Sequence, residues 1–156
     1  MAGSPQYLQI LKHLPREPGS HNTVVEAWHH LTENGPTETA LYSLAVAALN
    51  EAFDLGEVKT WSGFIERQAA LHIGKNAGYA GAANPDPWAN FRLSVHFGIP
   101  AFNGVLVRMS DKFSRYISLK ADASNDRIGE SIIDTLIDLG AYALIALCIA
   151  REETAT

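Results

Sequence analysis

Three carboxylates recur at intervals of four residues near the end of the chain. Glu130, Asp134 and Asp138 are followed by a long apolar run. In an α-helix each step of four residues turns about 400°, so these side chains form one acidic face. A carboxylate beside an apolar segment needs a basic partner, capping hydrogen bonds or a divalent cation to compensate its charge. Ligands that are all oxygen favour Mg²⁺ or Mn²⁺ over Zn²⁺.

A mixed cluster of charges precedes this acidic face. Arg108, Asp111, Lys112 and Arg115 follow the helical spacing i, i+3, i+4 and i+7 and share one arc of a helix. Three cations around one carboxylate are unfavourable unless they meet anions, either the acidic face or a bound phosphate. The alternative is that these side chains form a solvated face whose charges only pair with one another. In that case Asp134 and Asp138 pair with arginines, and Glu130 lies in the first turn of its helix because a negative charge is favourable there.

A short polar turn at 121–126 separates the two charged segments, so we expect the two helices to pack antiparallel. Helical bundles build metal and phosphate sites between such facing helices. If the protein is a hydrolase, the predicted catalytic residues are Glu130 and Asp134, and a metal-bound water would be the nucleophile. The predicted metal ligands are Asp111, Glu130, Asp134 and Asp138. The predicted phosphate-binding residues on these helices are Arg108, Lys112 and Arg115.

The longest irregular stretch, 78–86, begins beside a second group of candidate binding residues. Its Gly, Asn and Pro content excludes a continuous helix, and irregular segments often carry function. Lys75, Asn76 and Tyr79 supply a cation, an amide and a ring, which suits a phosphate, a base edge and a base face. We predict that all three contact the substrate.

Composition excludes several other classes of protein. The net charge of -5 argues against nucleic-acid binding, which needs a basic face. The single cysteine, Cys148, permits no intrachain disulfide, and the first 20 residues lack a continuous apolar core of the kind that secretion signals have. We therefore expect a cytoplasmic protein. The sequence also lacks a Walker loop, GxGxxG, GxSxG and Cys/His metal spacing.

Periodicity and helix-breaking residues predict an all-α fold, a helical bundle of about five to seven helices. No alternating strand pattern exceeds a few residues. The expected helices span residues 5–14, 23–32, 36–54, 60–76, 88–97, 102–120 and 127–151.

The end of the last helix is apolar around its whole circumference. Residues 141–150 carry small side chains that permit close approach of another helix, which predicts a homo-oligomer, most simply a dimer. The apolar run 136–150 is shorter than the roughly 20 residues that a membrane span needs and is interrupted by Asp138. We expect a buried helix and no membrane contact.

Three blocks of the sequence resemble the phage and bacterial nucleotide modification associated domain. That family's blocks look like K-N-x-D-Y-G, R-x-x-D-K-x-x-R and E-S-x-x-D-T-L-x-D-L-x-x-Y. The corresponding blocks here begin at Lys75, Arg108 and Glu130, and Gly78 replaces the acidic residue of the first block. The similarity covers roughly residues 64–150. It implies that 61–151 is a helical domain of this type and that 1–60 is an N-terminal helical extension, the two together forming one unit.

The family is more distantly similar to the all-α nucleoside triphosphate pyrophosphohydrolases of the MazG and dimeric dUTPase type. That resemblance implies a Mg²⁺-dependent protein, phage-encoded and acting in the host cytoplasm, that hydrolyses or binds a nucleotide or nucleotide derivative in nucleotide or DNA modification. Two alternatives remain open. The first is a non-enzymatic phage accessory protein that sequesters a nucleotide signal or binds a host protein, and the second is a structural helical oligomer.

Overall fold

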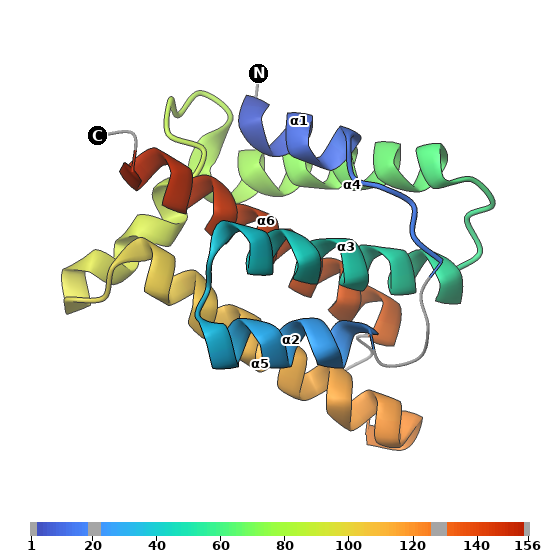
Figure 1. Ribbon diagram of the computed structural model, residues 1–156. Coiled ribbons are helices and arrows are strands. Elements are labelled where there is room, and N and C mark those ends of the chain that lie inside the picture. Colours follow the sequence, from blue (N-terminus) through green and yellow to red (C-terminus); the bar gives the residue numbers. More distant parts are fainter. Residues whose placement is uncertain (1–2, 19–22, 126–130, 155–156) are drawn as a thin grey trace.

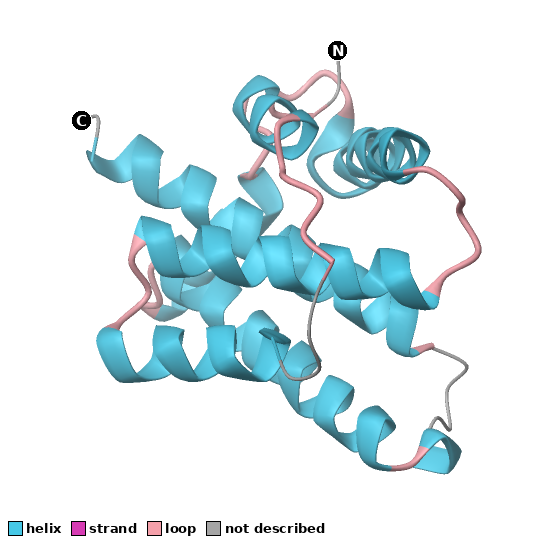
Figure 2. Cartoon of the chain, turned by 45° about the vertical axis from the view of Figure 1, so that its right-hand side comes forward, coloured by secondary structure: helices cyan, strands magenta, loops and turns pink. Residues whose placement is uncertain are grey.

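The computed structural model describes residues 3–18, 23–125 and 131–154, and every regular element in these ranges is helical. The α-helices there are α1 (Pro5–Lys12), α2 (Thr23–Asn34), α3 (Glu38–Leu55), α4 (Trp61–Asn76), α5 (Ala101–Ala121) and α6 (Ile132–Thr154). Shorter helices of tighter or wider winding lie between them, namely η1 (Ala77–Gly81), η2 (Ala89–Phe97) and η3 (Ala123–Asn125). Figure 2 shows helices in cyan and loops in pink throughout these ranges. The predicted all-α bundle is confirmed.

Local capping explains where several helices begin. The side chains of Ser4, Thr37 and Thr60 each accept a hydrogen bond from the backbone N–H three residues further on. These bonds satisfy donors that the first turn of a helix leaves unpaired. Pro5 follows Ser4 at the first helical position, where its missing N–H costs nothing.

Helix α6 forms the centre of the core. It packs against α3 and α5, and α5 and α6 run in opposite directions, as expected (Figure 1). Gly140 permits close contact with α3, because a Cβ at this position would lie 2.8 Å from Cγ of Leu49. Residues from α1, α2, α3 and α4 join the same hydrophobic cluster, so residues before 61 and after 61 share one core.

The apolar part of α6 is covered within one chain. Residues 143–149 are each no more than 8% exposed, because α3 and α5 pack over them. Residues 143–149 therefore present no apolar surface for the expected dimer, and the dimer itself stays a prediction. By length and composition α6 is the one described helix that meets the criteria for a membrane span, and most of its apolar part is buried in the core.

The irregular segment starts later than we expected. Helix α4 continues directly into the wide turn of η1, which ends at Gly81 with a φ of 94°. That backbone conformation suits glycine, which has no Cβ to clash. The expected short helix before Gly98 is present as η2, and Gly98 closes it in the left-handed conformation.

Candidate functional site

A cavity of about 330 Å³ lies where α1, α4, η1, η2, α5 and α6 approach one another. This volume is in the range of small-molecule sites. The six residues from our sequence prediction that line it are Lys75, Asn76, Tyr79, Arg108, Lys112 and Asp138. They come from four elements, so the fold brings together groups that lie far apart in the chain.

Asp138 lies between two lysines. The ammonium group of Lys75 on α4 is 3.0 Å from Oδ1, and that of Lys112 on α5 is 3.0 Å from Oδ2. The side chain of Asp138 is 22% exposed, so its charge is partly removed from solvent and both lysines compensate it. Asp138 therefore has a basic partner of the kind expected from its position, but the partners are lysines and not arginines.

Arg108 adds a third cation, one helical turn from Lys112. Among the described residues it forms no ion pair, and its guanidinium lies over the ring of Phe91 at 4.8 Å from the centroid. Among the described residues that line the cavity, three cations and one carboxylate give a net charge of about +2. A cavity with this excess of positive charge favours an anionic ligand.

Aromatic rings form much of the remaining wall. Tyr7 stacks on His72 with centroids 3.9 Å apart, and Phe91 meets Tyr142 edge to face. Tyr79 differs from these, because it is 74% exposed and contacts no other ring in the described part of the chain. Its face is therefore open to a planar ligand.

His72 contributes a neutral imidazole. The backbone N–H of Ser4 donates to Nε2 at 3.0 Å, which leaves Nδ1 as the protonated nitrogen. Burial lowers the pKa of His72 from 6.5 to about 4, so the ring is uncharged at neutral pH. Burial also raises the pKa of the Tyr7 phenol, with smaller contributions from Cys148 and Asp138. Neither ring adds charge to the cavity at neutral pH.

Asn76 holds the wall of the cavity together. Its side-chain carbonyl accepts from the N–H of Gly3 at 2.9 Å, and its amide donates to the carbonyl of Pro87. These bonds attach the N-terminal segment and the loop before η2 to the end of α4. We predicted contact with substrate for Asn76; the residue lines the cavity, but both ends of its amide already bind the protein.

Gln68 and Asn90 are cavity residues that our sequence prediction did not include. Gln68 on α4 is 7% exposed and forms no hydrogen bond with any residue in the described ranges. Asn90 is half-buried, and its side chain likewise makes no hydrogen bond to the described residues. The signal for Gln68 was its spacing of four from His72 and seven from Lys75, which places all three on one face of α4.

The other predicted metal and phosphate residues lie elsewhere. Asp111 and Asp134 are exposed, and neither they nor Arg115 line the cavity. The carboxylate of Asp134 accepts from the Ser131 hydroxyl, and that hydroxyl accepts from the Asp134 N–H, as at a capped helix start. Glu130 lies outside the described residues.

The predicted Mg²⁺ site stays a prediction, because one of its four ligands, Glu130, lies outside the described residues. No three His, Cys, Asp or Glu side chains among them are grouped closely enough to hold a metal ion. The carboxylate of Asp138 is held by two ammonium groups, which oppose the approach of a third cation. The acidic face of α6 is thus divided, with Asp138 turned toward α4 and α5 and Asp134 toward solvent.

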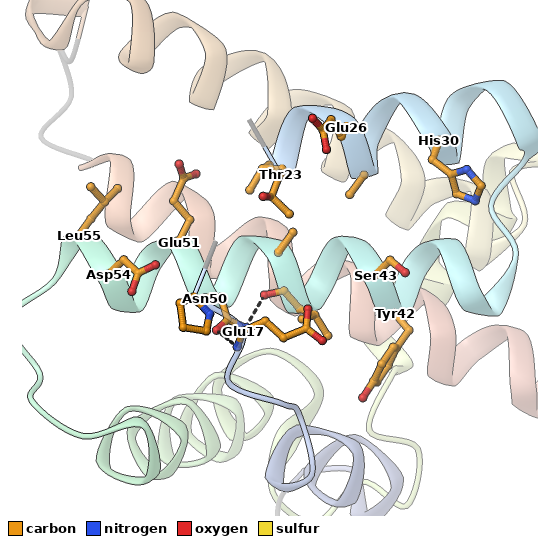
Figure 3. A pocket seen from close by; sticks show the side chains of 15 residues that line it. Glu17, Thr23, Glu26, His30, Tyr42, Ser43, Asn50, Glu51, Asp54 and Leu55 are labelled. Atoms are coloured by element: carbon orange, nitrogen blue, oxygen red, sulfur yellow. Dashed lines mark hydrogen bonds between the residues drawn. The ribbon is translucent and has the colours of Figure 1, made fainter. Parts of the chain in front are cut away.

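A larger cavity of about 780 Å³ lies between α2 and α3 (Figure 3). Its polar groups serve mainly to hold the segment after α1 against α3. The Asn50 amide donates to the carbonyls of Pro15 and Val46 and accepts from Arg16 and from the N–H of Glu17. Asp54 pairs with Arg16, and Glu51 pairs with Lys120. Asn50, Asp54 and Oε1 of Glu51 already bind other groups of the chain, which makes this cavity less suited to a ligand. Oε2 of Glu51 is buried without a hydrogen-bond partner in the described ranges.

No family model matches the chain, and neither a curated protein nor a solved structure matches it. The resemblance to the nucleotide modification associated domain stays a prediction.

Proposed function

We propose that this protein binds a nucleotide or nucleotide derivative in the cavity between α4, η2, α5 and α6. The observation that carries the proposal is the convergence of Lys75, Lys112 and Arg108 beside the open ring of Tyr79. A phosphate needs the cations, and a base needs the ring.

The phosphate would bind by replacing one ion pair with another. Lys75 and Lys112 now hold Asp138, and a phosphate that enters beside them would share their ammonium groups. Arg108 supplies a planar guanidinium that suits two phosphate oxygens at once. The stacking of this guanidinium on Phe91 limits its motion, so less entropy is lost on binding.

The base would stack on Tyr79 at the mouth of the cavity. Stacking on an aromatic ring contributes about 1–3 kcal/mol per base and accepts any base. Tyr79 is placed by η1, whose wide turn continues α4 beyond Asn76. The ring therefore lies on the same side of the molecule as Lys75, one turn away.

The described cations and the ring of Tyr79 support binding, and this is the form of the proposal that we carry forward. Mg²⁺-dependent hydrolysis stays a prediction, because Glu130 lies outside the described residues. Mg²⁺ or Mn²⁺ dependence, a phage origin, a cytoplasmic location and a homodimer stay predictions.

Calorimetric titration with nucleoside mono-, di- and triphosphates, with Mg²⁺ and with EDTA, tests the proposal. We expect binding that persists in EDTA and that weakens about tenfold or more in K75M and K112M, since each variant removes one charge-assisted hydrogen bond. K59M is the matched control, because Lys59 is exposed and lies outside the cavity. Absence of binding at millimolar nucleotide, or equal affinity in K112M and K59M, would overturn the proposal.

A further inference from the structure

The two lysines around Asp138 already hold one oxyanion between them. Lys75 meets Oδ1 and Lys112 meets Oδ2, each at 3.0 Å, so the two ammonium groups contact different oxygens of one carboxylate. A phosphate group presents two oxygens at nearly the same spacing, and it accepts the same charge-assisted hydrogen bonds from lysine. The lysine pair is therefore spaced for a single phosphate group.

The charge of the site also matches one phosphate monoester. Among the described lining residues, the cations Lys75, Arg108 and Lys112 exceed the one carboxylate by about +2. A phosphate monoester carries about -1.5 to -2 at pH 7, and each further phosphate adds negative charge. The side chains of Lys112 and Asp138 are each 22% exposed, so salt screens a charge mismatch here less than at the surface. One phosphate therefore neutralises the site, and a longer phosphate chain leaves it with excess negative charge.

The separation between Tyr79 and Lys75 determines which phosphate of a nucleotide meets the lysines. Tyr79, the ring proposed to hold the base, follows Lys75 by four residues, which is about one turn and roughly 6 Å along the helix axis. That separation accommodates a sugar between the base and the phosphate. The phosphate at the lysines is then the one attached directly to the sugar.

Beyond this phosphate the cavity wall offers no further cation. On the side of Lys75 away from Tyr79, helix α4 lines the cavity with Gln68, Leu71 and His72. His72 is uncharged at neutral pH, because burial lowers its pKa to about 4. The described lining residues include no Lys or Arg besides the three already named. A second or third phosphate placed there would lose its hydration without a compensating charge.

We propose that Asp138 is a specificity-determining residue and that the site selects nucleoside monophosphates over di- and triphosphates. The Asp138 carboxylate spaces the two lysines for one phosphate and holds the charge of the described lining residues at about +2, which a phosphate dianion neutralises. The volume of about 330 Å³ is near the lower end of the range of small-molecule sites, which also favours a compact ligand. This inference rests on the proposed nucleotide-binding function and adds the class of nucleotide to it.

Calorimetric titration in EDTA with the mono-, di- and triphosphates of adenosine and of uridine tests the inference. We expect wild type to bind each monophosphate about threefold or more tightly than the triphosphate of the same nucleoside. In D138N the charge of the described lining residues rises to about +3, so the affinity for triphosphate relative to monophosphate should rise by about threefold or more. D134N is the matched control on α6, because Asp134 is exposed and lies outside the cavity, and its affinity ratio should equal that of wild type.

The outcomes that would overturn the inference differ from failure of the proposed function. Triphosphates that bind wild type as tightly as monophosphates would leave nucleotide binding intact and remove the selection for one phosphate. An affinity ratio in D138N equal to that of D134N would remove the role of Asp138. The wild-type comparison needs no variant, so it decides the selection even if D138N folds poorly. If no mono-, di- or triphosphate binds wild type, the proposed function fails first, and the inference fails with it.

Discussion

The ammonium group of Lys112 lies 3.0 Å from Oδ2 of Asp138, and this contact joins the basic segment of α5 to the acidic segment of α6. The same carboxylate receives Lys75 on its other oxygen. Asp138 thereby acts as an internal anion that organises two lysines around the cavity. A bound phosphate would compete with this carboxylate for both ammonium groups.

Replacing Asp138 with asparagine should strengthen phosphate binding and weaken the fold. The change removes the competing negative charge, so we expect affinity for a nucleoside monophosphate to rise by about threefold or more. The ligand-free protein should lose about 1–3 kcal/mol in its free energy of unfolding, because two half-buried ion pairs disappear. Calorimetry and urea denaturation measure the two effects.

D134N is the matched control on the same helix. Asp134 is exposed and bonds only Ser131 among the described residues, so its loss should cost no more than about 1 kcal/mol and leave nucleotide affinity unchanged. Weaker phosphate binding in D138N, or loss of a Mg²⁺ response in D134N, would support the metal site predicted from the sequence.

Replacing Tyr79 with alanine should weaken nucleotide binding and leave stability unchanged. We expect a loss of about 1–3 kcal/mol in binding free energy, which is the usual value of one base stacked on a ring. The ring is 74% exposed and contacts no other described ring, so the melting temperature should stay within about 1 °C. F97A removes a ring that is 84% exposed and outside the cavity, and it should bind like wild type. Equal affinities in Y79A and F97A would contradict a stacking role.

Acidification should destabilise the chain through His72. The folded pKa is about 4, below the ordinary value of 6.5, so the unfolded chain takes up a proton that the folded chain excludes between these values. Stability is therefore complete above about pH 6.5 and is lost as the pH falls toward 4, by about 3 kcal/mol in all.

The measurement is the free energy of unfolding of wild type and H72Q at pH 7.0 and pH 4.5. H72Q should lose about 2–3 kcal/mol less than wild type over this interval, because Gln does not titrate. H96Q, which alters an exposed histidine, should follow wild type. Parallel pH curves for wild type and H72Q would mean that the imidazole is not held neutral by the fold.

Two glycine substitutions should change stability in opposite directions. In G140A the new Cβ would lie 2.8 Å from Leu49 Cγ and 3.0 Å from its Cδ2, so we expect a loss of about 1–3 kcal/mol. In G74A the new Cβ meets nothing within 4 Å, and better helix propensity should add about 0.5–1 kcal/mol. Thermal denaturation of both variants checks the close packing of α3 on α6. A neutral G140A would show that Leu49 moves aside without cost.

Local physical chemistry made much of the fold predictable from the sequence. Ser4, Thr37 and Thr60 cap helices through bonds that reach only three residues, and Gly98 ends η2 through its own backbone conformation. Such signals are complete within a short window, so an all-α chain and most helix positions followed from them. The charge of Lys75, Arg108 and Lys112 was equally visible, because residue type alone determines it.

The partners of these residues depended on the tertiary structure. Asp138 meets Lys75 across 63 residues, and no spacing rule distinguishes that lysine from a metal ion as the compensating charge. Glutamine side chains are mostly exposed, and only the tertiary structure places Gln68, at 7% exposure, in the wall of the cavity. The sequence by itself determined the helices and the chemical groups on their faces. Which faces meet was decided by long-range burial, because apolar surface is covered without regard to distance along the chain.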